Sequence, residues 1–291
     1  MIDAHHHIWR QTDLPWLNGP EQPRIFGLYK AIMRDYPIEE FREDLAGTGI
    51  KKSVYVQANW APDRAENEAA WVQSEADRNG WPHAIVGYCD FTADDVSAQL
   101  RRLKRYPLMR GVRQQLHWHH NPLYRFAPHA GLPADPKVRR NIALLADFGW
   151  SFDLQVFQQQ MVDAAGLAAS CPDVTFVLQH AGMLSDDTPE ERRSWETGLR
   201  RLADEPNIAC KLSAFGTFIH RNDAAFIADM VAKAVEIFGA DRCLFGSNFP
   251  IEKLWTSYAD LWAAFQTATD QLSQSDRQKI FNDTAARVYR L

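Results

Sequence analysis

The stretch from Ile208 to Ser247 reads IACKLS at 208–213, AAFIADMVAKAVEIF at 224–238 and CLFGS at 243–247. The first and last pieces are short and apolar, as expected of buried strands. The middle piece repeats its apolar residues at three- and four-residue spacings, which predicts an amphipathic helix, and Gly239 follows where a left-handed residue ends such a helix. A strand, a helix and a second strand in this order predict two parallel strands joined by a helical crossover.

The same alternation extends outward to both ends of the chain. The predicted strands are Ile2–Ile8, Ser53–Ala58, Ala84–Asp90, Met109–Gln115, Ser151–Phe157, Thr175–His180, Ile208–Ser213 and Cys243–Ser247. Eight strand and helix units favour a closed (β/α)8 barrel of the TIM type over an open doubly wound sheet. We therefore expect an α/β fold with one domain spanning residues 1–291.

Helices are predicted between these strands, and several carry end signals. They are Ala65–Asn79, Asp94–Arg105, Lys137–Phe148, Gln159–Ser170, Glu190–Ala203 and Ala224–Phe238. Gly80 and Gly149 follow helix ends, whereas Asp94 and Thr188-Pro189 are typical of helix starts.

Two connections are much longer than the others and lie after the first and fourth predicted strands. They are Arg10–Tyr36 and Leu116–Pro136, both rich in proline, tryptophan and other aromatic residues. Long loops in compact domains are commonly lids or binding loops, and these two follow strand ends where barrel enzymes build their sites. We expect Trp9, Trp16, Trp60 and Trp118 near the mouth of a pocket, where they suit a sugar ring and an aromatic ring equally well.

Charge and composition exclude several classes of function. The 291 residues carry a net charge of −5, so no basic field exists to hold nucleic acid or an anionic membrane surface. No basic, apolar leader begins the chain and no run of about eighteen apolar residues occurs, which predicts a cytoplasmic protein without a membrane span. Four widely spaced cysteines predict reduced, buried side chains rather than disulfides or a zinc knuckle.

Histidines stand at two predicted strand ends. His5 and His7 lie two residues apart, so both rings point to one side of the first strand, and His180 closes the sixth strand. Converging neutral imidazoles suit a divalent metal ion or can hydrogen-bond a substrate carbonyl or carboxylate. The alternative interpretation is that these rings are packed core histidines.

Further polar residues occupy the ends of the fourth, fifth and seventh strands. Arg113 is a permanent cation that needs an anionic or carbonyl partner, either in the substrate or in an internal ion pair with Asp153 or Asp90. One face of the fifth strand carries Asp153 and Gln155, and one face of the seventh carries Lys211 and Ser213. These four residues are candidates either for the polar lining of a pocket or for mutual neutralisation inside the barrel.

The eighth strand ends in FGSNFPIE at residues 245–252. Gly246 and Pro250 are expected to shape a turn that projects Asn248 over the pocket. Asn248 can hydrogen-bond but cannot serve as a general base at neutral pH. Glu252 can do so if its loop folds inward, although an exposed loop carboxylate is the favoured interpretation.

Taken together, these motifs resemble the amidohydrolase superfamily, in particular the amidohydrolase-2 branch that contains sugar-lactone and pyrone-dicarboxylate lactonases. The resemblance covers nearly the whole chain and rests on IDAHHHIW, GVR, FDLQ, QHAG, CKLS and FGSNFP in this order. It implies that His5 and His7 match the metal-binding H-x-H motif, that His180 matches a later strand-end histidine, and that Arg113 grips substrate. Asn248 departs from the pattern, because the superfamily has an aspartate there.

The resemblance implies hydrolysis of a lactone, either of a sugar acid or of a dicarboxylate, by addition of water to the ring carbonyl. Arg113 with His5 and His7 is assigned to polarise the carbonyl, His180 or else Glu252 to activate water, and Asn248 to position water or the ring oxygen. Gln155 and Lys211 are expected to contact substrate.

A divalent ion, zinc or manganese, is expected on His5, His7 and His180 if a metal is bound; some relatives are thought to work without one. The alternatives are a metal-dependent, non-oxidative decarboxylase of an aromatic acid and a non-catalytic ligand-binding barrel. The only partner expected is the small-molecule substrate, with a homo-oligomer also open.

Overall fold

Eight short parallel strands form one sheet in chain order, in a computed structural model that describes all 291 residues. The strands are β1 (Ile2–His6), β2 (Lys52–Val56), β3 (Ala84–Gly87), β4 (Met109–Val112), β5 (Ser151–Leu154), β6 (Phe176–Leu178), β7 (Ile208–Leu212) and β8 (Cys243–Phe245). The last strand meets the first just beyond β8, where the amide of His7 donates to the carbonyl of Phe249 at 2.7 Å. The predicted (β/α)8 barrel is confirmed.

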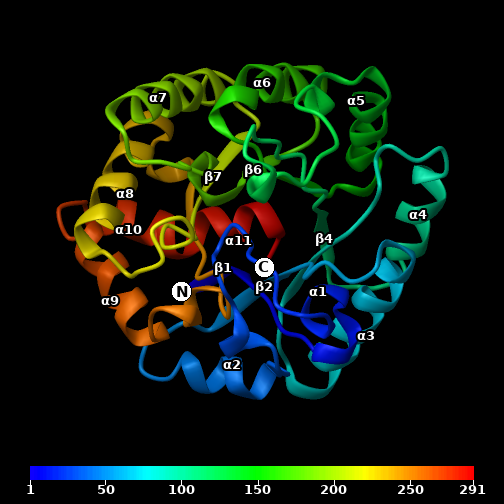
Figure 1. Cartoon of the computed structure of the whole chain (residues 1–291), viewed down its shortest axis with the longest axis horizontal. Helices are drawn as coiled ribbons and strands as arrows, with labels where there is room; N and C mark the ends of the chain where they lie inside the picture. Colours follow the sequence, from blue (N-terminus) through cyan, green and yellow to red (C-terminus); the bar gives the residue numbers. More distant parts are fainter.

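Most of the helices surround the barrel as a ring, and Figure 1 shows this arrangement along the barrel axis. The helices of the chain are α1 (Pro15–Asn18), α2 (Ile38–Asp44), α3 (Ala65–Asn79), α4 (Val96–Leu103), α5 (Pro136–Ala143), α6 (Met161–Ser170), α7 (Pro189–Ala203), α8 (Ala224–Phe238), α9 (Tyr258–Ala268), α10 (Gln274–Gln278) and α11 (Thr284–Tyr289). Two of the predicted helices, Ala65–Asn79 and Ala224–Phe238, match α3 and α8 at both ends. The long connection Arg10–Tyr36 contains the short helix α1.

The strands are shorter than predicted at their carboxyl ends. Each begins within one residue of the predicted start but ends one to three residues earlier. Left-handed residues, which cannot continue a strand, follow closely on four of them. These residues are Asn59, His180, Ala214 and Asn248, with φ between 56° and 63°. The apolar pattern therefore continues past the point where the hydrogen-bonded ladder stops.

Helix ends follow the predicted signals in all but one case. The Thr188 hydroxyl accepts a hydrogen bond from the amide of Glu191, and Gly80 and Gly149 adopt left-handed conformations after α3 and after the turn that extends α5. The prediction of a helix start at Asp94 is wrong, because α4 begins at Val96. Asp94 instead forms an exposed ion pair with Lys137.

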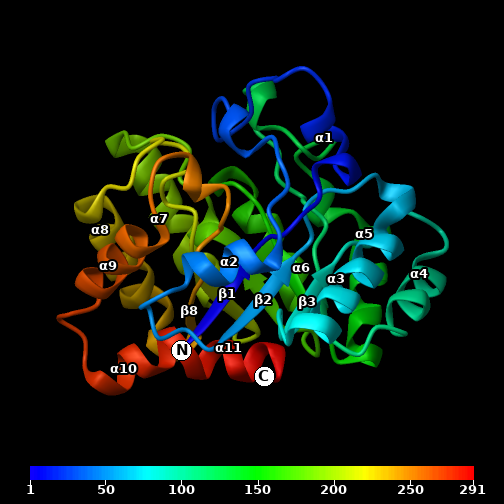
Figure 2. The same cartoon turned by 90° about the horizontal axis from the view of Figure 1, so that it is seen from below.

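Alternation along the strands divides the apolar residues into two layers. Outward-facing side chains such as Tyr55, Phe152 and Phe245 pack under the helices in the larger core. Inward-facing side chains such as Val54 and Val86 fill the barrel in a smaller, separate core. This interior core also contains Ala285, Val288 and Tyr289 of α11. In Figure 2, α11 lies across the amino-terminal ends of the strands, so it plugs that end of the barrel.

A buried ion pair crosses the barrel interior above this plug. The Lys211 ammonium lies 2.8 Å from a carboxylate oxygen of Asp153, and both side chains are fully buried. Gln179 donates to the same oxygen at 2.8 Å, and the hydroxyl of Tyr289 lies 3.1 Å from both oxygens of that carboxylate. The charges of Asp153 and Lys211 therefore neutralise each other within the barrel. Mutual neutralisation was one of the two alternatives that the sequence left open for these residues.

The remaining sequence expectations on cysteines and membrane spans can be compared directly with the fold. All four cysteines are buried and free, as predicted. None of the helices is both long and apolar enough to cross a membrane.

Substitution of Lys211 by methionine leaves the Asp153 carboxylate buried without its cation. We expect a loss of about 3 kcal/mol in the free energy of unfolding, as is typical when one member of a buried pair is removed. Urea denaturation checks this, with the surface variant Lys233→Met as control. A Lys211→Met protein as stable as the control would contradict the role given to the pair.

Candidate active site

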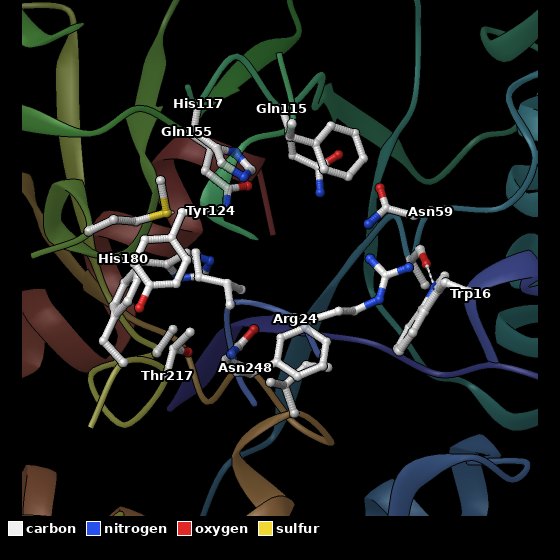
Figure 3. Close-up of a pocket in the computed structure, with 18 of the residues that line it drawn as sticks. Trp16, Arg24, Asn59, Gln115, His117, Tyr124, Gln155, His180, Thr217 and Asn248 are labelled. Atoms are coloured by element: carbon white, nitrogen blue, oxygen red, sulfur yellow. Dashed lines mark hydrogen bonds between the residues drawn. The ribbon is translucent and has the colours of Figure 1, made fainter. Parts of the chain in front are cut away.

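A pocket lies at the carboxyl ends of the strands, and its empty space, open solvent included, is about 930 Å³. Figure 3 shows it with its polar and aromatic lining. The lining includes His7, Trp9, Trp16, Arg24, Asn59, Arg113, Gln115, His117, Tyr124, Gln155, His180, Met183, Thr217, Phe218 and Asn248. Both long connections predicted from the sequence contribute to it, and no aspartate or glutamate does.

A β-bulge in the first strand sets the direction of its histidines. Between Asp3 and His6 the strand advances three residues while β2 advances two, so one extra residue is inserted. Ile2 and Ala4 face the interior core, and strict alternation would then turn His5 and His7 outward. The bulge reverses the alternation, so that His6 stacks outward on Phe41.

The carboxylate of Asp3 holds this bulge. One oxygen accepts hydrogen bonds from the amides of His5, at 3.0 Å, and Ser247, at 2.9 Å. The other accepts from the hydroxyl of Tyr258 in α9 at 2.8 Å. Asp3 thus joins β1, the end of β8 and the outer helix, and it is completely buried.

Three histidines meet at the floor of the pocket. The ring of His5 lies 5.1 Å from that of His7 and 4.9 Å from that of His180, measured between centroids. His7 and His180 line the pocket, whereas His5 lies beneath them, fully buried, with neither ring nitrogen hydrogen-bonded. The structure therefore brings the predicted trio together and leaves two of its members facing the pocket.

All three rings are held neutral by their surroundings. Burial, aided by the Arg113 charge, lowers the pKa of His7 to about 3. Burial, with Arg113 and Lys211, lowers the pKa of His180 well below its usual value. His7 donates from Nδ1 to the Val56 carbonyl at 2.7 Å, so in its neutral form Nε2 carries the lone pair. Nδ1 of His180 lies 2.8 Å from the hydroxyl of Ser213.

Arg113 provides a cation at the pocket wall. It has no carboxylate partner within ion-pair distance; one terminal nitrogen donates to the carbonyl of Gln57 at 2.5 Å, and its Nε has no partner. Burial lowers the pKa of its guanidinium to about 10, which keeps it charged near neutral pH. The internal ion pairs that the sequence left open for Arg113, with Asp153 or Asp90, are absent.

The other two residues expected to contact substrate lie differently. Gln155 lines the pocket, with its amide nitrogen 3.3 Å from the sulfur of Met183 and its carbonyl oxygen unpaired. Lys211 lies outside the pocket lining, in the barrel interior, because Asp153 holds its charge there.

Asn248 and Glu252 form a second polar group behind one wall. Asn248 lines the pocket, and its backbone amide donates to the carbonyl of His5 at 2.7 Å. Its backbone carbonyl accepts from the amide of Glu252 at 3.3 Å. The interpretation of Glu252 as an exposed loop carboxylate is wrong, because only 1% of the residue is exposed. Trp255 donates to it at 2.8 Å and Thr217 at 3.3 Å. Burial raises the pKa of Glu252 to about 7.

Several lining residues escaped the sequence analysis. Arg24, Asn59 and Tyr124 lie in loops without a recognisable motif. Gln115 is the last residue of a predicted strand, and His117 lies two residues beyond it. Only the length and aromatic content of the two long connections indicated that residues there would line a pocket. Trp60 and Trp118, expected near the mouth, do not line the pocket, and their rings pack against Arg64 and Arg125 instead.

The donor set does not fit a resident divalent ion. No group of three or more histidine, cysteine, aspartate or glutamate side chains is arranged to hold a metal. The three imidazoles bring no negative charge, and Arg113 and Lys211 add positive charge beside them, which disfavours a divalent cation. The amide of Asn248 supplies no negative charge to offset it.

Comparison with known proteins identifies the family. The amidohydrolase family model matches residues 2–291. The chain belongs to the amidohydrolase family. It is 36% identical to y4mH, an uncharacterized protein of Sinorhizobium fredii, over all of this chain and 98% of the other. It is 28% identical to L-fucono-1,5-lactonase of Burkholderia multivorans, over all of this chain and 96% of that enzyme.

One solved amidohydrolase, from Burkholderia multivorans with bound zinc, has a similar structure. Its TM-score is 0.84 at 26% identity, and the match covers all of this chain and 99% of the other. The predicted family is confirmed, and the family includes a protein that binds a metal.

Removal of the Asp3 carboxylate tests the bulge. We expect Asp3→Ala to lower the free energy of unfolding by about 2 to 4 kcal/mol, because two buried amides and a hydroxyl lose their acceptor. Asp3→Asn keeps an oxygen acceptor and should lower the free energy of unfolding by a smaller amount. Urea denaturation compares the two variants. If Asp3→Ala were as stable as the unaltered protein, the bulge would not depend on the Asp3 carboxylate.

Proposed function

We propose that this amidohydrolase opens a lactone ring by adding water to its carbonyl. The observation that carries the proposal is the pairing of Arg113, a cation without a carboxylate partner, with the neutral ring of His180 in one pocket. A cation stabilises the oxyanion that forms when water adds to an ester, and a neutral imidazole accepts the proton of that water. The named lactonase relatives support the same reaction class.

The substrate ring is expected to lie between aromatic walls. Trp9 and Trp16 come from one loop, Tyr124 from the other and Phe218 from the connection after β7. Gln115, Gln155 and Asn59 add amides that suit hydroxyl and ring oxygens. A polar ring with oxygen substituents fits this lining, as in sugar-acid and dicarboxylate lactones.

The reaction follows from the charge states of the side chains. Nε2 of His180 takes a proton from water as the water oxygen bonds to the carbonyl carbon, and Arg113 stabilises the oxyanion. The tetrahedral intermediate then collapses, the bond from this carbon to the ring oxygen breaks, and His180 returns the proton to that oxygen. The product is a hydroxy acid. His7 cannot donate to the carbonyl from Nε2, since its proton is on Nδ1, so Arg113 carries the polarisation.

Asn248 and Glu252 are positioning residues in this scheme. Glu252 does not line the pocket, and its carboxylate contacts the lining through the hydroxyl of Thr217. The backbone of Asn248 is held by hydrogen bonds to His5 and Glu252, and its side chain lines the pocket, where it can orient water or the ring oxygen. His5 supports the rings of His7 and His180 from below.

Neither alternative suggested by the sequence gains support from the pocket. A metal-dependent decarboxylase needs a firmly held divalent ion, which this donor set does not fit. A non-catalytic barrel does not require an unpaired arginine facing a neutral histidine, and turnover of any lactone would dismiss it.

The direct test is hydrolysis of a panel of sugar-acid and dicarboxylate lactones, followed as acid release above the spontaneous rate. We expect turnover of one stereochemical group. Arg113→Met should lower kcat/KM by about 100- to 1000-fold, the usual effect of removing an oxyanion donor. Arg110→Met is the matched control, because Arg110 bonds carbonyls of Pro107 and Met109 outside the pocket. No turnover across the panel would refute the proposal.

The pH dependence separates the two candidate bases. The pKa of His180 lies well below 6.5, so its neutral form is complete from pH 6 to 8 and kcat/KM should stay level across that range. If ionised Glu252 were the base, its pKa of about 7 would make kcat/KM fall as the pH drops below 7. The assignment of His180 as the base would be contradicted if kcat/KM fell below pH 7 in the unaltered protein and this fall were absent in Glu252→Gln.

Metal removal is expected to have no effect. Dialysis against a chelator should leave lactone hydrolysis unchanged, and elemental analysis of the purified protein should find far less than one divalent ion per chain. One zinc or manganese ion per chain would contradict the scheme if activity were lost when the ion is removed and recovered when it is added back. The ion would then be assigned to His5, His7 and His180.

A further inference from the structure

The pocket contains a second arginine that the proposed chemistry does not use. Arg24 lies in the connection after β1 and lines the pocket. Its guanidinium stacks over Trp16, 5.2 Å from the ring centroid, and its Nε is buried without a hydrogen-bond partner. A cation in such a position needs an acceptor that the protein does not provide.

No carboxylate of the protein neutralises Arg24. The pocket lining contains no acid, and the three acids of the surrounding loop are engaged elsewhere. Asp13 pairs with Arg10 and Arg64, Glu21 accepts from the amides of Tyr29 and Lys30, and Asp35 accepts from the amide of Gln11.

Arg24 stands apart from the catalytic histidines. The charge of Arg113 is among the main causes that lower the pKa of His7, His117 and His180, and that of Arg24 is not. In Figure 3, Arg24 lies beside Asn59 and Trp16, across the cavity from His180. The two arginines therefore serve different parts of a bound molecule.

Arg125, a third arginine of the lining, is already occupied. Its guanidinium donates to the carbonyls of His119 at 2.9 Å and His120 at 2.7 Å. Asn59, in contrast, presents a side-chain amide to the pocket next to Arg24. A guanidinium with a neighbouring amide donor is a suitable pair for one carboxylate.

We propose that Arg24 and Asn59 form a subsite for a carboxylate carried by the substrate, so that the lactone opened here is an anionic one. This inference rests on the proposed lactonase function and narrows its substrate class to lactones that retain a free acid group, such as those of sugar diacids. Ring opening then yields a dicarboxylate, with the new carboxylate at Arg113 and the original one at Arg24.

The test compares aldarolactones, which keep a free carboxylate, with aldonolactones of the same stereochemistry, which carry a hydroxymethyl group there. The unaltered protein should prefer the aldarolactone. Arg24→Met should lower kcat/KM for the aldarolactone by about 10- to 100-fold, the range of a charge-assisted hydrogen bond, and that for the aldonolactone by less than about 3-fold. Arg24→Lys should recover part of the preference. Arg125→Met, the matched control, should leave the ratio of the two unchanged.

Calorimetry with the ring-opened products keeps the subsite testable even if no lactone reacts. Arg24→Met should weaken binding of the aldarate but not of the matching aldonate. Loss of both affinities equally, or of neither, would overturn the subsite while leaving the lactonase proposal intact. A preference of the unaltered protein for the aldonolactone would overturn it too, whereas failure of every lactone to react would refute only the reaction.

Discussion

The buried carboxylate of Asp3 is the constraint on which the site depends. By accepting from the amides of His5 and Ser247, it holds the bulge in β1 and joins that strand to the end of β8. Without the extra residue, the alternation begun by Ile2 and Ala4 would turn the two histidines toward the helices. Gly246 is part of the same arrangement, because a Cβ there would lie 2.6 Å from the Cβ of His5. The contacts that close the barrel between β8 and β1 therefore also orient the histidine rings.

The interior is layered by charge. The pair of Asp153 and Lys211 lies lowest, closed off by α11, and is electrically satisfied. Neutral histidines form the next level, because burial and the nearby cations disfavour their protonation. The pocket above them contains arginines and amides but no acid. Negative charge brought or developed by a substrate is therefore stabilised there, which suits an ester oxyanion and a carboxylate.

Much of the fold was predictable from the sequence, because eight apolar segments at regular intervals admit few arrangements. The pattern could not give the strand ends, where left-handed residues such as Asn59 and Asn248 stop the ladder without changing the apolar character. The sequence pattern did predict that His7, His180 and Arg113 share one pocket, because the carboxyl ends of barrel strands converge. Glu252 was a candidate, but its burial was not predictable from the pattern, and Arg24 was missed. Both depend on contacts between segments distant in the chain.

The central claim is that Arg113 and His180 act on one carbonyl group, Arg113 on its oxygen and His180 on the water that attacks its carbon. A crystal structure with a lactam, in which nitrogen replaces the ring oxygen and hydrolysis is suppressed, tests it most directly. The account predicts that the lactam carbonyl oxygen accepts from Arg113 and that Nε2 of His180 faces the carbonyl carbon through one water. A lactam bound with its carbonyl directed away from Arg113, or bound to a metal on the histidines, would contradict it.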